Sequence, residues 1–209
     1  MIKTILFDMG GVLFLLDTAE AKKRFEALGV DSDRYLGAYG QKGIFHDLES
    51  GLIDADEFLR RLSEMTGHEV TWNQARHAWL GYCKGVPQDR LDYLNSLRPK
   101  YRTCLASNTN PFIMYFCNSS EFSKDGFPLN HYLDHLYCSY RMGVQKPSAE
   151  FFNRIIETEG VTPDEILFVD DSKKNIEAAE RLGIHGLWVD SNNDQDWMPE
   201  LEAKLKELN

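Results

Sequence analysis

The stretch Thr4-Ile5-Leu6-Phe7-Asp8-Met9-Gly10-Gly11 decides the fold class. Its first four residues form a short apolar run typical of a buried parallel strand, and the glycines allow the backbone to turn away after it. In parallel sheets, ligands bind at the edge where the carboxyl ends of the strands lie. Asp8 therefore stands where α/β proteins keep reactive groups, although an Asp before two glycines is also a good turn former or helix cap.

Four further segments are short, apolar and bounded by turn residues, and they predict additional strands. These expected strands cover residues 103–106, 136–139, 166–169 and 186–189. Apolar residues between the later segments recur at helical spacing, so strands and helices alternate. This alternation predicts an α/β fold with a Rossmann-like, mostly parallel sheet that is covered by helices on both faces.

A long interval of about 90 residues separates the first expected strand from the second, far more than one crossover helix needs. Capping signals at Thr18, Asp54 and Thr71 predict three helices in this interval, and a weaker helix is expected over 33–39. These signals predict a small helical domain inserted after the first strand. The expected domains are an α/β core of residues 1–16 and 86–209 and a helical cap of residues 17–85.

The charge balance restricts the partners of the protein. Lys and Arg total 23 against 33 Asp and Glu, which gives a net charge of −10 in 209 residues. No basic cluster compensates locally, so neither nucleic acid nor an anionic membrane is an expected partner. The N-terminal stretch is too short for a signal peptide, no run approaches membrane-spanning length, and the four cysteines lack close-pair spacing. We expect a cytoplasmic protein that is a monomer or a weak homodimer.

Polar residues follow several of the expected strands, where the carboxyl ends of parallel strands share one edge. They are Asp8, Ser107-Asn108, Lys146 within Gly143-Val144-Gln145-Lys146-Pro147, and Asp170-Asp171. Mg²⁺ takes carboxylate oxygens, water and substrate phosphate, and Asp8, Asp170 and Asp171 can supply the carboxylates. A lysine at the same edge offsets phosphate charge, and Ser107 with the backbone N–H groups after it can bind phosphate oxygens.

Each of these residues has a simpler structural explanation when it is taken alone. Asp170-Asp171-Ser172 can be a helix cap, Lys146 a surface lysine before a proline, and Ser107-Asn108 a turn. Four such coincidences, all at strand ends and in compatible order, are much less expected than one. The combination predicts a site for a phosphorylated ligand and a divalent cation.

With these motifs the chain resembles the haloacid dehalogenase (HAD) superfamily, whose members are mostly Mg²⁺-dependent phosphatases acting through an aspartyl-phosphate. The matching motifs are Ile5-Leu6-Phe7-Asp8, Leu105-Ala106-Ser107-Asn108, Gly143-Val144-Gln145-Lys146-Pro147 and Phe168-Val169-Asp170-Asp171. The helical insertion resembles the C1-type cap of the superfamily. Within it, the phrases Asp8-Met9-Gly10-Gly11-Val12, Ser107-Asn108-Thr109-Asn110 and Glu49-Ser50-Gly51-Leu52-Ile53 resemble glucose-1-phosphate phosphatase-like members.

The resemblance implies a role for each matching residue. The implied metal ligands are Asp8, which is also the nucleophile, Asp170, Asp171 and the backbone carbonyl of Gly10. The implied phosphoryl-binding residues are Ser107, Asn108 and Lys146, and Lys146 also supports catalysis. The cap is expected to close over the site and select the substrate. The cap residues expected near the substrate are His46 and Asp47, with the aromatic side chains of Tyr39 and Phe45.

One expected carboxylate is missing. In most phosphatases of the superfamily, the residue two positions after the nucleophile is an Asp that serves as general acid and base, and here that position is Gly10. Positioned proton transfer typically contributes about 10²–10⁴-fold in rate. A phosphatase can tolerate the loss when the leaving group is good, as in a sugar 1-phosphate or an acyl phosphate. Alternatively the cap supplies the proton, with Asp17, His46 and Asp47 as candidates.

Two other functions are compatible with Gly10. A metal-independent 2-haloacid dehalogenase also lacks the second Asp, but the Asp170-Asp171 pair is a metal-site feature that such enzymes generally lack. A catalytically weak phosphate-binding protein would retain the fold with little turnover. We expect a Mg²⁺-dependent phosphatase that hydrolyses a small phosphorylated metabolite, with a sugar 1-phosphate as the leading candidate.

Overall fold

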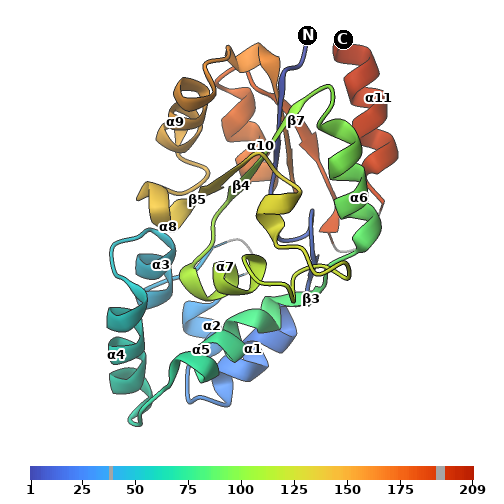
Figure 1. Ribbon diagram of the computed structural model, residues 1–209. Coiled ribbons are helices and arrows are strands. Elements are labelled where there is room, and N and C mark those ends of the chain that lie inside the picture. Colours follow the sequence, from blue (N-terminus) through green and yellow to red (C-terminus); the bar gives the residue numbers. More distant parts are fainter. Residues whose placement is uncertain (38–39, 192–195) are drawn as a thin grey trace.

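The computed structural model describes residues 1–37, 40–191 and 196–209, and its centre is a five-stranded sheet (Figure 1). The strand order is β5-β4-β1-β6-β7, and every neighbouring pair is parallel. The strands are β1 (Thr4–Phe7), β4 (Arg102–Ser107), β5 (His135–Cys138), β6 (Ile166–Asp170) and β7 (His185–Trp188). The predicted α/β fold is confirmed, and each strand lies within one residue of its expected limits.

Helices connect and follow these strands. The α-helices are α1 (Thr18–Glu26), α2 (Ser32–Tyr35), α3 (Ile44–Glu49), α4 (Ala55–Thr66), α5 (Trp72–Trp79), α6 (Gln88–Leu97), α7 (Pro111–Cys117), α8 (Ser139–Met142), α9 (Ala149–Glu159), α10 (Lys173–Glu180) and α11 (Met198–Leu208). The 3₁₀ helices are η1 (Leu80–Tyr82), η2 (Leu129–His131) and η3 (Pro163–Glu165). The helix expected over 33–39 is represented only by the shorter α2, and residues 38–39 lie outside the described residues.

Two layers of helices cover the sheet because side chains alternate between its faces along each strand. Ile5 and Phe7 of β1 pack in one apolar cluster with leucines of α6 and α11. Leu6 packs on the other face, with phenylalanines of α9 and alanines of α10. The central strand is therefore buried on both faces, which is why it appears in the sequence as a continuous apolar run.

The helices α1 to α5 follow one another between two short antiparallel strands, β2 (Leu15–Leu16) and β3 (Cys83–Gly85). The sequence pattern did not predict this ribbon, because two or three residues are too few to show an alternation. In Figure 1, α1, α2, α4 and α5 gather at one end of the molecule, with α3 and α7 between them and the sheet.

Aromatic side chains form the core of this helical group. The ring of Phe45 lies 5.1 Å from Phe25, 5.4 Å from Phe58 and 5.7 Å from Trp79, measured between centroids. Edge-to-face pairs of this kind stabilise a core beyond the burial of their surface. Phe45 is completely buried among these rings, so it is a packing residue, and its expected contact with substrate has no support from the geometry.

The capping signals were correct for α4 and α5, where Asp54 and Thr71 cap the helices. At α1 the cap is Asp17 and not Thr18, and its carboxylate accepts a hydrogen bond of 2.8 Å from the backbone N–H of Glu20. An N-cap carboxylate satisfies an otherwise unpaired helix N–H. Asp17 is therefore a structural residue, and its expectation as a proton donor is not supported.

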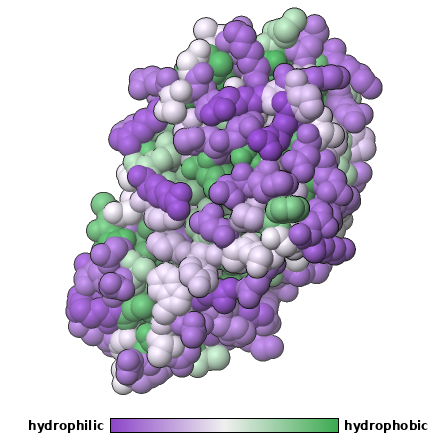
Figure 2. Space-filling model, in the orientation of Figure 1, coloured by the Kyte–Doolittle hydropathy of each residue, from purple (hydrophilic) through white to green (hydrophobic). Residues whose placement is uncertain are grey.

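The surface of the face drawn in Figure 2 is mostly hydrophilic, with apolar residues scattered between polar ones. The large apolar side chains that are exposed on the described residues are Met1, Leu52, Tyr115, Phe127 and Trp188. Isolated residues of this kind are normal on a protein surface. Within the described part of the chain, every helix is too short or too polar to span a membrane.

Candidate active site

The carboxyl ends of β1 and β6 bring the first two acidic residues together. Phe7 is paired with Val169 in the sheet register, and the backbone N–H of Asp8 donates to the carbonyl of Val169 at 2.9 Å. Asp8 follows β1, and Asp170 is the last residue of β6. The sheet register alone therefore places the two carboxylates on neighbouring strands at the same edge, as expected from the sequence.

Asp8, Asp170 and Asp171 form a compact cluster. Each offers one carboxylate oxygen, and the three atoms all lie within 4.8 Å of one another. Asp170 and Asp171 are buried, while Asp8 is partly exposed. Burial and the neighbouring charge of Asp8 raise the pKa of Asp171 above its usual range, and burial also raises the pKa of Asp170. Crowded carboxylates of this kind attract a cation.

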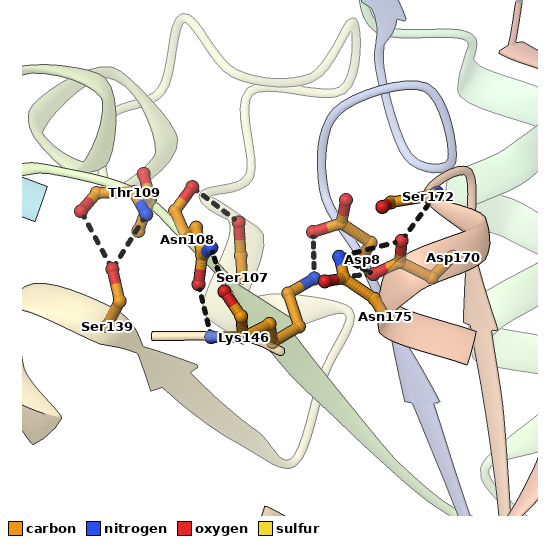
Figure 3. A network of polar contacts seen from close by, with 9 residues as sticks. All are labelled: Asp8, Ser107, Asn108, Thr109, Ser139, Lys146, Asp170, Ser172 and Asn175. Carbon is orange, nitrogen blue, oxygen red and sulfur yellow. Dashed lines mark hydrogen bonds and ion pairs between the residues drawn. The ribbon is translucent and has the colours of Figure 1, made fainter. Parts of the chain in front are cut away.

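Lys146 is the ammonium group paired with this cluster (Figure 3). Its Nζ lies 2.8 Å from Oδ1 of Asp8 and 2.6 Å from Oδ2 of Asp170, and its side chain is almost completely buried. Burial by itself would lower the pKa of Lys146, but the charges of Asp170 and Asp8 outweigh it and raise the pKa above its usual range. Lys146 is therefore a fixed positive charge and not the surface lysine of the simpler interpretation.

Asn108 holds the backbone of Lys146 at both of its polar groups. Its Nδ2 donates to the carbonyl of Lys146 and its Oδ1 accepts from the N–H of Lys146, each at 2.9 Å (Figure 3). This two-point contact joins the end of β4 to the loop that carries the lysine. Asn108 therefore positions Lys146, and its expected contact with phosphate stays a prediction.

Asn175 and Ser172 orient Asp170. The amide Nδ2 of Asn175 lies 3.0 Å and 3.1 Å from the two carboxylate oxygens, and the backbone N–H of Ser172 donates to Oδ1 at 2.7 Å. Sequence reasoning missed Asn175. The available signal was its place in the first turn of α10, four residues after Asp171.

Gly11 is required by the position of Asp171. Its φ is +78°, and a Cβ added there would lie 2.7 Å from Oδ2 of Asp171. The same carboxylate oxygen accepts a hydrogen bond of 2.7 Å from Oγ of Ser191. A side chain at position 11 would therefore both strain the backbone and displace an acidic oxygen of the cluster.

A cavity of about 110 Å³ lies over these residues. The residues that line it are Asp8, Met9, Gly10, Phe14, Leu16, Gly40, Gln41, Glu49, Trp79, Tyr82, Ser107, Asn108, Ile113, Lys146, Asp171, Ser172 and Asn175. The sheet side contributes Asp8, Asp171, Lys146, Ser107 and Gly10, and the helical insertion contributes Gln41, Glu49, Trp79 and Tyr82. The structure thus brings both parts of the chain to one cavity.

The two expected substrate contacts of the insertion, His46 and Asp47, do not line this cavity. Asp47 lies 3.6 Å from the guanidinium of Arg61, and the ring of His46 lies 3.4 Å from Oγ of Ser50. Since α3 directs these side chains toward the outside, their role in substrate binding has no support from the geometry. Tyr39, the other expected contact, lies outside the described residues.

Glu49 is the carboxylate that the insertion places in the cavity. It is the last residue of α3 and only 7% exposed. Burial raises the pKa of Glu49 to about 8, and the side-chain amide of Asn110 offsets part of that rise. The sequence motif around Glu49 was noted, but no chemical role was assigned to it, because helical spacing does not reveal which residue of a short helix faces a distant sheet.

These features suit a hydrolase that transfers a phosphoryl group to a carboxylate nucleophile at the edge of a parallel sheet. The family model of haloacid dehalogenase-like hydrolases matches residues 2–183. The chain belongs to this family. The resemblance that the motifs indicated is confirmed.

Relatives support the phosphatase class. Over 206 residues the chain is 44% identical to the D-ribitol-5-phosphate phosphatase of Bacteroides thetaiotaomicron, covering 98% of this chain and 99% of that protein. The structure of a HAD-like hydrolase from Porphyromonas gingivalis is 39% identical with a TM-score of 0.92, and covers 98% of each chain. A HAD enzyme of B. thetaiotaomicron, solved with magnesium and inorganic phosphate, is 33% identical with a TM-score of 0.83 over 94% of this chain and 98% of that one. The protein is a HAD-type phosphatase.

Proposed function

We propose that the protein is a Mg²⁺-dependent phosphatase for a small sugar or polyol phosphate. The observation that carries the proposal is the group formed by Asp8, Asp170, Asp171 and Lys146. All of these except the fully buried Asp170 line one cavity. The magnesium and phosphate in the related B. thetaiotaomicron enzyme support the same assignment. Ionised carboxylates bind a hard divalent cation, and a lysine beside them offsets the charge of a phosphate.

The donor set fits Mg²⁺. The cluster within the described residues offers only carboxylate oxygens, which are the ligands of a hard cation. Three acidic groups face one ammonium, so a divalent cation would remove the excess negative charge. Asp8, Asp170 and Asp171 would hold it, with the carbonyl of Gly10 as a further expected ligand. When bound, Mg²⁺ supplies charge neutralisation for the phosphate oxygens.

The residues of the chain would then act in sequence. Oδ of Asp8 attacks the phosphorus, the bond to the alcohol oxygen breaks, and an aspartyl-phosphate forms. Lys146, the ion-pair partner of Asp8, contacts the transferred group, while Ser107 donates a hydrogen bond to a phosphate oxygen. Water then attacks the phosphorus, which releases inorganic phosphate and regenerates Asp8.

The helical insertion would act as a cap over this chemistry. We propose residues 17–85 as the cap, since the ribbon of β2 and β3 marks where the chain enters and leaves the helical group. Gln41, Glu49 and Tyr82 would line the substrate side of the site. A closed cap excludes water and so strengthens the electrostatic contacts with phosphate.

The polar lining supports a hydroxylated substrate. Gln41 and Tyr82 are hydrogen-bonded to each other at 3.2 Å, and both line the cavity. The indole N–H of Trp79, also a lining residue, is buried with no hydrogen-bond partner among the described residues, and a substrate oxygen would satisfy it. The relative named for D-ribitol 5-phosphate makes that compound the first to test, ahead of the sugar 1-phosphates.

Two further expectations belong to this proposal. All four cysteines are unpaired and three are buried, which supports a reducing compartment such as the cytoplasm.

A function as a metal-independent dehalogenase is disfavoured, because Asp170 and Asp171 would then place buried negative charge beside Asp8 without a cation to offset it.

The proposal is tested by measuring phosphate release from a panel of ribitol 5-phosphate, sugar 1-phosphates, other sugar phosphates and acetyl phosphate. The expected result is turnover with Mg²⁺, none with EDTA, and none in Asp8→Ala. Release of no phosphate from any member, with Mg²⁺ or phosphate still bound, would instead favour a phosphate-binding protein with little activity. Metal-independent halide release would favour the dehalogenase.

A further inference from the structure

We propose that Glu49 is the general acid and base of the reaction, in place of a carboxylate at position 10. The proposal rests on the phosphatase function proposed above. Cleavage of an alkyl phosphate leaves an alkoxide, which needs a proton as it departs. Position 10 is a glycine and supplies none, although it lines the cavity.

Elimination among the ionisable groups favours Glu49. Those that line the cavity within the described residues are Asp8, Asp171, Lys146, Tyr82 and Glu49. The first three form the ionic cluster on the sheet side and are engaged with one another. Burial raises the pKa of Tyr82 far above its usual range, so its phenol is a weak acid. Glu49 is the remaining group with an acidic proton to give.

The position of Glu49 is also suitable. In an in-line displacement the leaving oxygen points away from the attacking carboxylate. Asp8 attacks from the sheet side of the cavity, and Glu49 belongs to the helical insertion that forms the other side. Glu49 therefore lies on the side of the cavity toward which the leaving oxygen points.

Two contacts fix the residues that directly follow Glu49 against the core. The side-chain amide Nε2 of Gln145, the neighbour of Lys146, donates a hydrogen bond of 2.9 Å to Oγ of Ser50. Gly51, with φ of +68°, packs so closely on α8 that an added Cβ would lie 2.3 Å from the carbonyl of Tyr140. The turn that carries Glu49 is thus seated on the core, and this precision is what proton transfer requires.

Burial keeps Glu49 protonated at neutral pH, because it raises the pKa to about 8. The groups that face it are Asn110, which lowers this pKa, and Tyr82, whose own pKa the charge of Glu49 raises. A carboxylic acid with a pKa near the working pH can both give and take a proton.

The proton balance closes over two steps. When Asp8 attacks, the bond from phosphorus to the alcohol oxygen breaks, and the carboxyl O–H of Glu49 protonates that oxygen, leaving alcohol and a carboxylate. In the second step, the carboxylate of Glu49 takes a proton from the attacking water. The water oxygen forms a new bond to phosphorus, and the bond between phosphorus and the Asp8 oxygen breaks. Inorganic phosphate is released, and the Asp8 carboxylate and protonated Glu49 are restored.

The test compares two substrates in Glu49→Gln. Ribitol 5-phosphate leaves as an alkoxide and needs a proton, whereas acetyl phosphate leaves as acetate and does not. We expect kcat for ribitol 5-phosphate to fall by about 10²–10³-fold, while the first turnover of acetyl phosphate in a quenched-flow experiment stays within about threefold of the wild type. Glu64→Gln makes the same change on an exposed residue of α4 and serves as the control.

Three results would overturn the proposal. Glu49→Gln could slow both first turnovers equally, which indicates a structural role, or slow neither. It could also raise KM for ribitol 5-phosphate without changing kcat, which indicates that Glu49 binds a hydroxyl group. The wild-type enzyme and Asp8→Ala separate these results from a failure of the phosphatase function, since wild-type turnover that depends on Asp8 must be present in every case. Thermal unfolding of each variant verifies that it is folded.

Discussion

The ammonium of Lys146 lies 2.8 Å from Oδ1 of Asp8, so the proposed nucleophile has a buried counter-ion. The same ammonium is 2.6 Å from Asp170. This geometry places a positive charge at the point where Asp8 has to attack a phosphate, which itself carries negative charge. The sequence predicted the lysine at this edge, and the structure adds that it serves two carboxylates at once.

Removal of this counter-ion should be costly. In Lys146→Met, Asp8 and Asp170 lose their partner, and breaking a buried pair destabilises by about 3–5 kcal/mol. We expect a lower unfolding temperature in EDTA, together with loss of phosphatase activity. Added Mg²⁺ should stabilise the variant more than the wild type, because the cation offsets the uncovered negative charge. Equal stabilisation of both proteins in thermal melts would show that the metal does not bind at this cluster.

Gly11 provides a test of the metal site that leaves the carboxylates in place. Gly11→Ala should weaken Mg²⁺ binding, because the new Cβ would press on Oδ2 of Asp171. Gly67→Ala is the matched control, since Gly67 has a φ of +76° with nothing within 4 Å of the added Cβ. Both variants should lose about 1 kcal/mol or more of stability from the positive φ. Only Gly11→Ala should bind Mg²⁺ more weakly in calorimetry.

Glu49 should also be visible in the pH dependence of stability. In the folded protein its pKa is raised to about 8, against a usual value of 4.5, so the folded state binds an extra proton between these values. The contribution of this extra proton on Glu49 to the free energy of unfolding is therefore fully present below pH 4.5, and it is lost as the pH rises through about 8. Glu49→Gln cannot ionise at this position, so its stability does not fall in this way. Its free energy of unfolding should be higher than that of the wild type by a few kcal/mol at pH 8, and nearly equal to it at pH 5.

The comparison requires urea denaturation of both proteins across this pH range in EDTA, where the acidic cluster contributes equally to both. A constant difference between the two proteins, independent of pH, would mean that Glu49 is already ionised in the folded state.

Position 10 allows a rescue experiment. If Glu49 replaces a carboxylate there, then adding Gly10→Asp to the Glu49→Gln variant should raise its activity on ribitol 5-phosphate at least about tenfold. The substitution is sterically feasible, because the added Cβ meets the flexible end of Leu16, whose Cδ2 lies at 2.9 Å. Gly10→Asn in the same background is the control, as it has the same shape without an acidic proton. Equal recovery with Asn and Asp, or none with either, contradicts the proton-transfer role.

The core site could be predicted from the sequence because parallel strands impose its geometry. Asp8, Ser107 and Asp170 each stand at the end of an apolar run, and the carboxyl ends of such runs share one edge. Lys146 lies on a loop, yet its place after β5 is set by the same sheet. Local pattern and tertiary geometry therefore agree for these residues.

The side of the cavity formed by the helical insertion could not be predicted in the same way. Which residue of α3 enters the cavity depends on how that short helix packs against α8, a long-range contact that leaves no periodic trace in six residues. The prediction therefore favoured the chemically conspicuous His46 and Asp47, which do not line the cavity, over Glu49, which does. Phe45, an aromatic neighbour of His46, was also expected near the substrate, and it packs instead in the aromatic core.

The central claim is that Asp8 forms a covalent phosphoryl intermediate, and the most direct measurement is mass spectrometry of acid-quenched enzyme during turnover of ribitol 5-phosphate with Mg²⁺. The account predicts a mass gain of one phosphoryl group, mapped by peptide analysis to Asp8 and absent in Asp8→Asn. Turnover without any phosphoenzyme, or a phosphoryl group on another residue, would contradict it.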